Sequence, residues 1–248
     1  MPVEVFGNSA HFDIYEQIAR RRGLSLIEDC CEALGATLAG RPAGSFGDCG
    51  VFAFYPNKQI TTGEGGMIVT DSERTRDLCV SMRNQGRDSN AWLSHARLGY
   101  NYRMSELNAA VGQVQIQRLD EILAKRRRVA EAYDLALAGQ KEIHLPPMAE
   151  RENASWFVYV IRLAEQFTVS QRDTVIQRLR SNGIGCSNYF VPIHTQPYVM
   201  ELLGTKPGDF PSTESVASRT IALPFHSNLH QEEVFEVSKA LAQATTGI

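Results

Sequence analysis

The chain has 248 residues, of which 43% are hydrophobic and 21% are charged, as expected for a soluble globular protein with one large or two modest domains. Its formal net charge of −3 and its pI near 6.1 argue against nucleic acid or an anionic membrane as a partner. No apolar run approaches the ~18 residues of a membrane-spanning helix, and the opening residues lack the pattern of a signal peptide. The five cysteines are not at metal-ligand spacing, so we expect reduced thiols, no metal site and a cytoplasmic location.

The first elements predict a strand, a helix and a second strand. Residues 1–6 alternate apolar and polar side chains, residues 13–22 have helical periodicity, and residues 24–27 form a short apolar run. The helix residues expected to face the core are Ile14, Ile18 and Ala19. Such a unit favours a parallel sheet, in which ligands bind beyond the carboxyl ends of the strands. Asp29 lies at that end of the second strand.

A stretch from residue 51 to residue 70 contains two short apolar runs, 51–55 and 67–69, around a loop with one lysine and three glycines. This pattern predicts a strand, a tight loop and another strand. Lys58 is the only lysine among the first 124 residues, a span that contains many arginines. Because arginine can supply positive charge as well, an isolated lysine suggests that an amine is required. The alternative is an ordinary solvated loop charge.

The rest of the chain predicts a long helix and a smaller α/β unit. Helical periodicity covers residues 71–87 and 105–137, with an irregular polar and aromatic segment between them. The basic residues 125–128 are interpreted as a solvated helix face. After a proline-containing linker, the expected strands are 156–163, 184–189 and 221–223, and the expected helices are 170–182, 195–203, 212–220 and 231–244. We therefore expect two domains, 1–138 and 139–248.

Asp29 and Lys58 are predicted at the same edge of the sheet, which suits one cofactor. Pyridoxal phosphate needs a lysine amine for its Schiff base and a carboxylate that keeps its pyridine nitrogen protonated. The lysine, once released, moves a proton between carbons as a general acid and base. The alternative for Asp29 alone is a turn or helix-cap residue.

Three segments resemble the pyridoxal-phosphate-dependent sugar aminotransferases of the DegT/DnrJ/StrS type. They are E-D-C-C-E-A-L-G-A at 28–36, G-S-F-G-D-C-G-V-F-A-F-Y-P-N-K-Q-I-T-T-G-E-G-G-M-I-V-T at 44–70, and L-G-Y-N-Y-R-M-S-E-L-N-A-A at 98–110. Their order and spacing match as well, and a looser resemblance extends over most of the chain. It implies an α/β fold. The large domain of an aspartate-aminotransferase-like transferase (fold type I) would be present in part, with a mainly parallel sheet, followed by a smaller C-terminal α/β domain.

The resemblance also implies a role for each matching residue. Lys58 is the catalytic, Schiff-base lysine, Asp29 is the partner of the pyridine nitrogen, and Glu32 lies near the cofactor ring, where the family often has glutamine or histidine. Asn101, with Arg103 nearby, corresponds to an asparagine that reaches the cofactor phosphate of the neighbouring subunit, which implies a homodimer with shared sites. The implied reaction moves an amino group, usually from glutamate, to a keto group of a nucleotide-linked sugar.

Two departures from the family pattern affect these expectations. Ala53 occupies a position where many members have a serine that contacts the phosphate. Family members also begin well upstream, with a phosphate-binding turn and an aromatic residue that stacks on the cofactor ring. This leads us to expect a truncated chain with exposed apolar surface, weak cofactor affinity and reduced activity.

Two other functions stay open at this stage. A non-catalytic subunit or regulatory binding module would keep the fold without the reaction. A sugar dehydratase of the same fold is less favoured, because the resemblance implies a histidine in place of Lys58 in such enzymes. His194 and His226 are interpreted as packing or substrate-rim residues.

Overall fold

A computed structural model describes residues 1–88, 94–147 and 153–248. The contacts divide the chain into unit 1, Met1–Ala124 with Met148–Phe157, and unit 2, Lys125–Pro147 with Val158–Ile248. The domain boundary expected after residue 138 stays a prediction, since these units are groups of mutual contacts and one helix continues from the first into the second. None of the described helices combines the length and apolar character needed to cross a bilayer.

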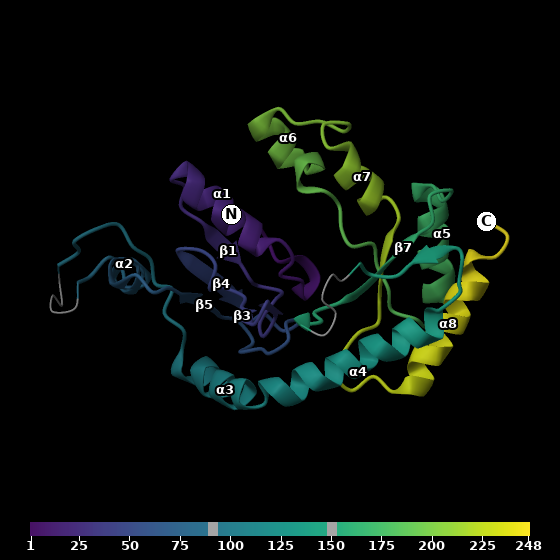
Figure 1. The fold of residues 1–248 in the computed structure, drawn as a ribbon, viewed down its shortest axis with the longest axis horizontal. Coiled ribbons are helices and arrows are strands. Elements are labelled where there is room, and N and C mark those ends of the chain that lie inside the picture. Colours follow the sequence, from purple (N-terminus) through teal and green to yellow (C-terminus); the bar gives the residue numbers. More distant parts are fainter. Residues whose placement is uncertain (89–93, 148–152) are drawn as a thin grey trace. The chain divides into compact units, whose positions relative to one another are not determined.

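The sheet of unit 1 has the strand order β1 (Ile27–Asp29), β4 (Cys49–Ala53) and β5 (Gly66–Val69). β1 and β4 run parallel, whereas β4 and β5 are antiparallel, so the sheet is mixed (Figure 1). The predicted opening strand is reduced to a parallel bridge between Val3 and Asp29, followed by the 3-10 turn η1 (Val5–Gly7). A small hairpin of β2 (Thr37–Leu38) and β3 (Arg41–Pro42) lies between β1 and β4 in the sequence.

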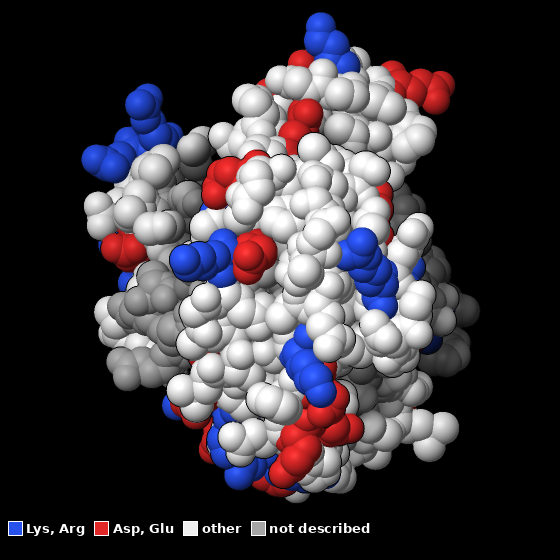
Figure 2. Space-filling model, turned by 90° about the vertical axis from the view of Figure 1, so that its right-hand side faces the viewer, with Lys and Arg blue, Asp and Glu red and all other residues white. Residues whose placement is uncertain are grey.

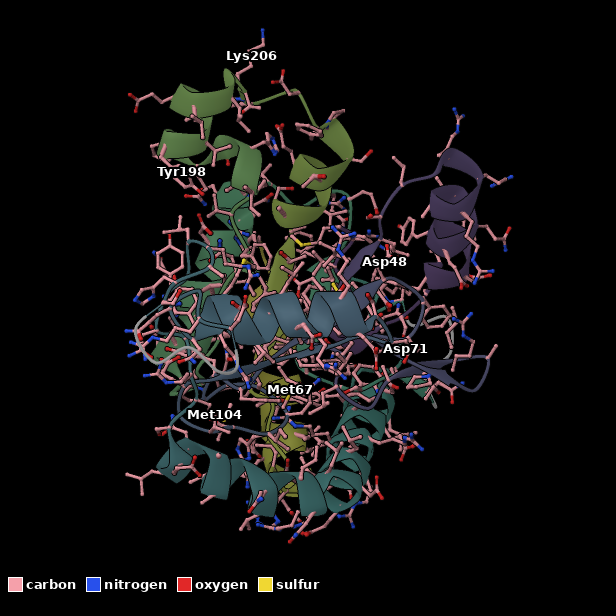
Figure 3. The ribbon with its side chains drawn as sticks, turned by 90° about the vertical axis from the view of Figure 1, so that its left-hand side faces the viewer. Asp48, Met67, Asp71, Met104, Tyr198 and Lys206 are labelled. Carbon is pink, nitrogen blue, oxygen red and sulfur yellow. The ribbon has the colours of Figure 1, made fainter. Side chains whose placement is uncertain are left out.

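Alternating burial along β4 explains how this strand holds the unit together. Gly50 and Phe52 point to the buried side, and Phe52 belongs to the apolar core of the unit. The core residues are Cys30, Ala33, Ala36, Ala43, Phe52, Phe54, Ile60 and Ile122. Thr70 Oγ1 donates to Asp48 O at 2.7 Å, and Figure 3 shows Asp48 and Asp71 at one end of the β4–β5 hairpin, away from Met67.

The helix α1 (Phe12–Arg22) confirms the predicted helix, and Gly23 ends it in the left-handed conformation, at φ 61°. The predicted inward face is only partly correct. Ala19 is buried, but Ile14 and Ile18 are 45% and 41% exposed, and Phe12 provides the buried contact instead. An amphipathic pattern indicates which side of a helix is apolar, but not whether the chain itself covers that side.

The helix predicted over residues 105–137 is two helices, α3 (Glu106–Gln117) and α4 (Leu119–Leu137), with the break at Arg118. Ser105 caps α3 by accepting a hydrogen bond from Asn108 N. No residue of α3, all of which the structure describes, is buried, and Leu107 is 81% exposed. The preceding helix α2 (Glu73–Arg83) is capped in the same way by Ser72.

Unit 2 is built on the antiparallel strands β6 (Ile143–His144), β7 (Tyr159–Leu163) and β8 (Thr220–Leu223), in that order. The predicted strand 184–189 is a single bridge between Ser187 and Ala222. The helices of the unit are α5 (Val169–Ser181), α6 (Pro197–Leu203), α7 (Pro211–Ala217) and α8 (Gln231–Thr245), with the 3-10 turn η3 (Ile193–Thr195) before α6. The helices α5 and α8 pack side by side (Figure 1).

Charged side chains do not gather by sign on the face shown in Figure 2, where Lys and Arg lie interspersed with Asp and Glu on a mainly uncharged surface.

Tyr133 explains how the second half of α4 is held within unit 2. Its ring stacks on that of Tyr159 at 4.7 Å, and its hydroxyl donates to Pro224 O at 2.7 Å. Burial raises the pKa of the Tyr133 hydroxyl, which keeps this donor protonated.

Candidate functional site

Asp29 and Lys58 lie at one edge of the mixed sheet. Asp29 is the last residue of β1, and Lys58 lies in the turn after β4, where its N–H donates to Tyr55 O at 3.0 Å. Because β1 and β4 are parallel neighbours, the chain leaves both strands on the same side. The fold therefore places a carboxylate and the loop with a primary amine next to each other.

The Lys58 amine lies between an acid and an aromatic face. Its Nζ is 3.7 Å from Glu32 Oε1 and 4.3 Å from the centre of the Phe157 ring. The side chains of Lys58 and Glu32 are each only 14% exposed. Both neighbours attract a cation, one through charge and the other through the ring quadrupole. The amine is thus held at a defined, largely buried position.

Glu32 connects this amine to the start of the chain. Its second carboxylate oxygen, Oε2, accepts a hydrogen bond from Phe6 N at 2.8 Å. Phe6 and Gly7 both have positive φ angles, 63° and 84°, so the backbone turns sharply at this point. An added Cβ on Gly7 would lie 1.7 Å from Ser155 O, so only glycine fits there.

Asp29 holds the start of the next turn. Its Oδ1 accepts a hydrogen bond from Cys31 N at 3.1 Å. Burial and the Asp29 carboxylate raise the pKa of the Cys31 thiol to about 12. The thiol therefore stays protonated at neutral pH and is a poor nucleophile, although it lies near the amine.

Asn101 lies elsewhere in unit 1. It forms a backbone bridge with Asn84, whose side-chain oxygen accepts from Arg103 Nη1 at 2.7 Å. The rings of Tyr100 and Tyr102 stack at 5.1 Å beside it and are largely exposed. Within the described residues, no hydrogen bond or ion pair joins Asn101 to Asp29, Glu32 or Lys58. Lys58 and Glu32 are therefore in contact and Asp29 lies at the same sheet edge, whereas Asn101 is bonded to Asn84.

Three residues near the amine were not identified from the sequence: Phe157, Gln59 and Ser155. Phe157 and Ser155 are almost 100 residues away from Lys58 in the chain, and no local pattern links such distant segments. Gln59 Nε2 donates to Ser155 Oγ at 2.8 Å. For Gln59, the only signal in the sequence is its position next to Lys58.

A buried acidic cluster lies on the other side of β1. Glu28 is fully buried, and its carboxylate accepts hydrogen bonds from the backbone N–H groups of Phe46 and Gly47 at 2.6 Å and of Gly44 at 2.9 Å. Glu4 is also fully buried, but neither of its carboxyl oxygens has a hydrogen-bond partner among the described residues. Burial and the neighbouring Glu28 raise the pKa of the Glu4 carboxyl from 4.5 to about 8. Glu4 is therefore protonated at neutral pH.

Replacing Glu4 by glutamine is expected to reduce the loss of stability at alkaline pH. The unfolded chain loses the Glu4 proton near pH 4.5, whereas the folded chain keeps it up to about pH 8. The stabilising contribution of the bound proton is complete below the lower value and is lost as pH rises through the higher one. Between pH 5 and 8.5, the free energy of unfolding of the unsubstituted chain should fall relative to the variant by on the order of 4 kcal/mol.

Urea unfolding at pH 5, 6.5 and 8.5 measures this difference. Glu201→Gln on the exposed surface of α6 serves as the control and should leave the pH dependence unchanged. Parallel pH profiles for Glu4→Gln and the unsubstituted chain would contradict the raised pKa.

The two histidines interpreted as packing or rim residues have defined partners in unit 2. His194 is buried, its Nε2 lies 2.8 Å from Glu214 Oε1, and its ring packs 4.7 Å from that of Phe210. The bond to His194 lowers the pKa of the Glu214 carboxyl. The helix α6 that follows has exposed residues such as Tyr198, labelled in Figure 3. His226 Nδ1 lies 3.3 Å from Asn228 N. His194 is therefore a packing residue here.

Comparison with known proteins gives a consistent result. Residues 1–242 match the DegT/DnrJ/EryC1/StrS aminotransferase family. The chain is 36% identical over 245 residues to a GDP-perosamine synthase of Vibrio cholerae, covering 97% of this chain and 65% of that protein. It is 32% identical over 255 residues to a dTDP-3-amino-3,4,6-trideoxy-alpha-D-glucose transaminase of Micromonospora megalomicea subsp. nigra, covering 100% of this chain and 66% of that one.

Solved structures show the same fold. DesV of S. venezuelae, in complex with a ketimine intermediate, superposes with a TM-score of 0.89 at 30% identity and covers 100% of this chain and 65% of its own. The PLP-form of a putative sugar aminotransferase, Spr1654 of Streptococcus pneumoniae, gives a TM-score of 0.90 at 25% identity, covering 98% and 67%. The chain thus spans about 65% of the length of the curated relatives it matches.

Proposed function

The chain belongs to the DegT/DnrJ/EryC1/StrS aminotransferase family, and we propose that the protein is a pyridoxal-phosphate-dependent sugar aminotransferase. The observation that carries this proposal is the Lys58 amine, largely buried, beside Glu32 and at the same sheet edge as Asp29. The relatives that are named synthases or transaminases are longer than this chain, so the proposal concerns the activity of the whole protein.

The residues present fit the cofactor. A primary amine can bond to its aldehyde carbon, and a carboxylate at the same sheet edge can pair with its protonated pyridine nitrogen. Ala53, the last residue of β4, offers no side-chain donor to a phosphate, so backbone N–H groups or other residues would have to hold that group. When bound, pyridoxal phosphate supplies a conjugated ring that takes up the electron pair released at the substrate carbon.

The chain's own groups then have separate tasks. Lys58 Nζ would hold the cofactor through its aldehyde carbon, and the free amine would move a proton from the substrate carbon to another position. Asp29 would keep a proton on the pyridine nitrogen of the bound cofactor, and its hydrogen bond from Cys31 N orients its carboxylate. Glu32 holds the amine near the position where it reacts.

The proposed substrates are a nucleotide-linked keto sugar and glutamate as the amino donor. The names of the relatives, which include GDP-linked and dTDP-linked amino sugars, support this class. We assign the protein to the cytoplasm, where its five free cysteines would stay reduced.

The proposed assembly is a homodimer in which Asn101 serves the neighbouring site. Asn101 is exposed and lies apart from its own Lys58, and the stacked rings of Tyr100 and Tyr102 beside it offer a rigid aromatic contact surface. Apolar side chains that a partner would cover include Met67 and Ile68 on β5, which are 49% and 47% exposed.

Release of 2-oxoglutarate tests the proposed reaction. The protein is incubated with pyridoxal phosphate, glutamate and a panel of GDP-linked and dTDP-linked keto sugars. We expect 2-oxoglutarate to form in proportion to an amino sugar for at least one member of the panel. Absence of product with every member, in a protein shown to bind the cofactor, would contradict the proposal.

A non-catalytic subunit is the second candidate, and the exposed apolar residues of β5 and α3 favour it. Such a subunit would bind a partner through this surface. It would show cofactor binding without turnover until that partner is added.

A further inference from the structure

Gln59, the residue after Lys58, is buried, and its side-chain nitrogen lies within hydrogen-bond distance of three oxygens. Its Nε2 donates to Ser155 Oγ at 2.8 Å, to Ser155 O at 3.2 Å and to the backbone oxygen of Glu32. Ser155 Oγ in turn donates to Leu34 O at 2.6 Å, so its proton is already used and its lone pair faces Gln59. The direction of every bond in this network is therefore fixed.

The network joins four segments that are far apart in the sequence. Ser155 N donates to Gly7 O at 2.9 Å, so the strap formed by residues 153–157 is bonded to the opening turn, to the segment 32–34 and to the loop of Lys58. Ser155 itself is only 1% exposed. Buried polar groups in such a network rigidify their surroundings when all of them are satisfied.

Both groups that contact the Lys58 amine are attached to this network. Phe157, whose ring lies 4.3 Å from Nζ, is two residues beyond Ser155. Glu32, whose carboxylate lies 3.7 Å from Nζ, accepts from Gln59 through its own backbone oxygen. Gln59 thus holds the residues on both sides of the amine without contacting the amine itself.

We propose that Gln59 is a positioning residue for Lys58, which acts through Ser155 and the backbone of Glu32 to set the aromatic and the acidic neighbour of the amine. This inference rests on the proposed function, because the amine must be placed to receive the cofactor. Its structural part, however, concerns the reactivity of Lys58 alone and is measured without cofactor.

The test compares Gln59→Leu with the unsubstituted protein in two measurements. The first is the rate at which trinitrobenzenesulfonate modifies Lys58 without cofactor, followed by peptide mapping, with Lys125, Lys141, Lys206 and Lys239 as internal references. Loss of the network should free the amine and raise the Lys58 rate about tenfold, the effect of one buried hydrogen bond. The second is the dissociation constant for pyridoxal phosphate, which should rise about tenfold for the same reason.

Unit 2 offers a matched control. Gln140 Nε2 donates to Ser238 Oγ at 3.1 Å and lies 3.4 Å from Ser238 O, which repeats the Gln59–Ser155 pair away from Lys58. Gln140→Leu should lower the melting temperature about as much as Gln59→Leu does. It should leave the modification rate of Lys58, relative to the reference lysines, unchanged. Ser155→Ala should reproduce the effect of Gln59→Leu, the double variant should add little to either, and Ser155→Thr, which keeps the hydroxyl, should restore most of the original rate.

An unchanged relative rate at Lys58 in both Gln59→Leu and Ser155→Ala would overturn the positioning role. If Gln59→Leu does not fold, the result for Ser155→Ala decides. Absence of cofactor binding in the unsubstituted protein would overturn the proposed function instead, and the trinitrobenzenesulfonate rates would still decide the role of Gln59.

Discussion

Replacing Lys58 by arginine should abolish the absorbance band of the bound cofactor and lower the transamination rate by at least about 10³-fold. Arginine keeps the positive charge next to Glu32 and Phe157, so the electrostatics of the site change little. A guanidinium, however, does not lose its proton at neutral pH and cannot attack an aldehyde. The expected loss is therefore one of chemistry and not of folding.

Absorbance titration with pyridoxal phosphate and single-turnover release of 2-oxoglutarate measure this effect. Lys141→Arg, at an exposed position in unit 2, is the matched control and should behave like the unsubstituted protein. Borohydride reduction in the presence of cofactor followed by peptide mapping should label Lys58. A Lys58→Arg variant that keeps the absorbance band would show that another amine holds the cofactor.

Replacing Glu28 by glutamine should destabilise the protein by about 3–5 kcal/mol, the cost of breaking a buried, charge-assisted set of hydrogen bonds. The carboxylate accepts three backbone N–H groups from residues 44–47, and it is fully buried. A glutamine amide would turn an NH₂ group toward at least one of these donors, which would leave it unsatisfied. Because Asp29 follows directly, the cofactor site should also lose affinity.

Urea unfolding at pH 6.5 measures the loss, with Glu131→Gln on an exposed position of α4 as the control. The Glu28→Gln variant should also expose the amides of residues 44, 46 and 47 to hydrogen exchange. A change below 1 kcal/mol, together with retained protection of these amides, would argue against the role of Glu28 in holding the loop.

Local patterns predicted the elements that contain the site. The helix that ends at Gly23 and the two strands that flank the Lys58 loop follow from short-range periodicity and turn residues. The strand expected at 24–27 instead covers Ile27–Asp29, so Asp29 is its last residue. The capping box of α5, in which Thr168 and Gln171 bond each other's backbone N–H, is likewise a local feature. Such signals depend on residues that are close together in the sequence, so they can be recognised without knowledge of the fold.

The surroundings of the amine did not follow from the sequence. Phe157 reaches the Lys58 amine, and Ser155 reaches Gln59, only because the chain returns to unit 1 after leaving it. The periodicity of α3 correctly indicated a helix, but Leu107 is exposed because the described chain places nothing over that side. Long-range pairing and the covering of an apolar face depend on the whole fold, and sometimes on other chains.

The way in which Glu28 holds its loop has a consequence for how this region can change during evolution. The carboxylate recognises main-chain N–H groups, which every residue except proline provides, so side chains such as that of Ser45 are open to substitution. The spacing is not. An added Cβ on Gly47 would lie 2.4 Å from Leu26 O, and Gly44 has a φ of 84°. A single-residue insertion or deletion between these glycines would be far more damaging than replacement of Ser45, so the loop should keep its length even where that side chain changes.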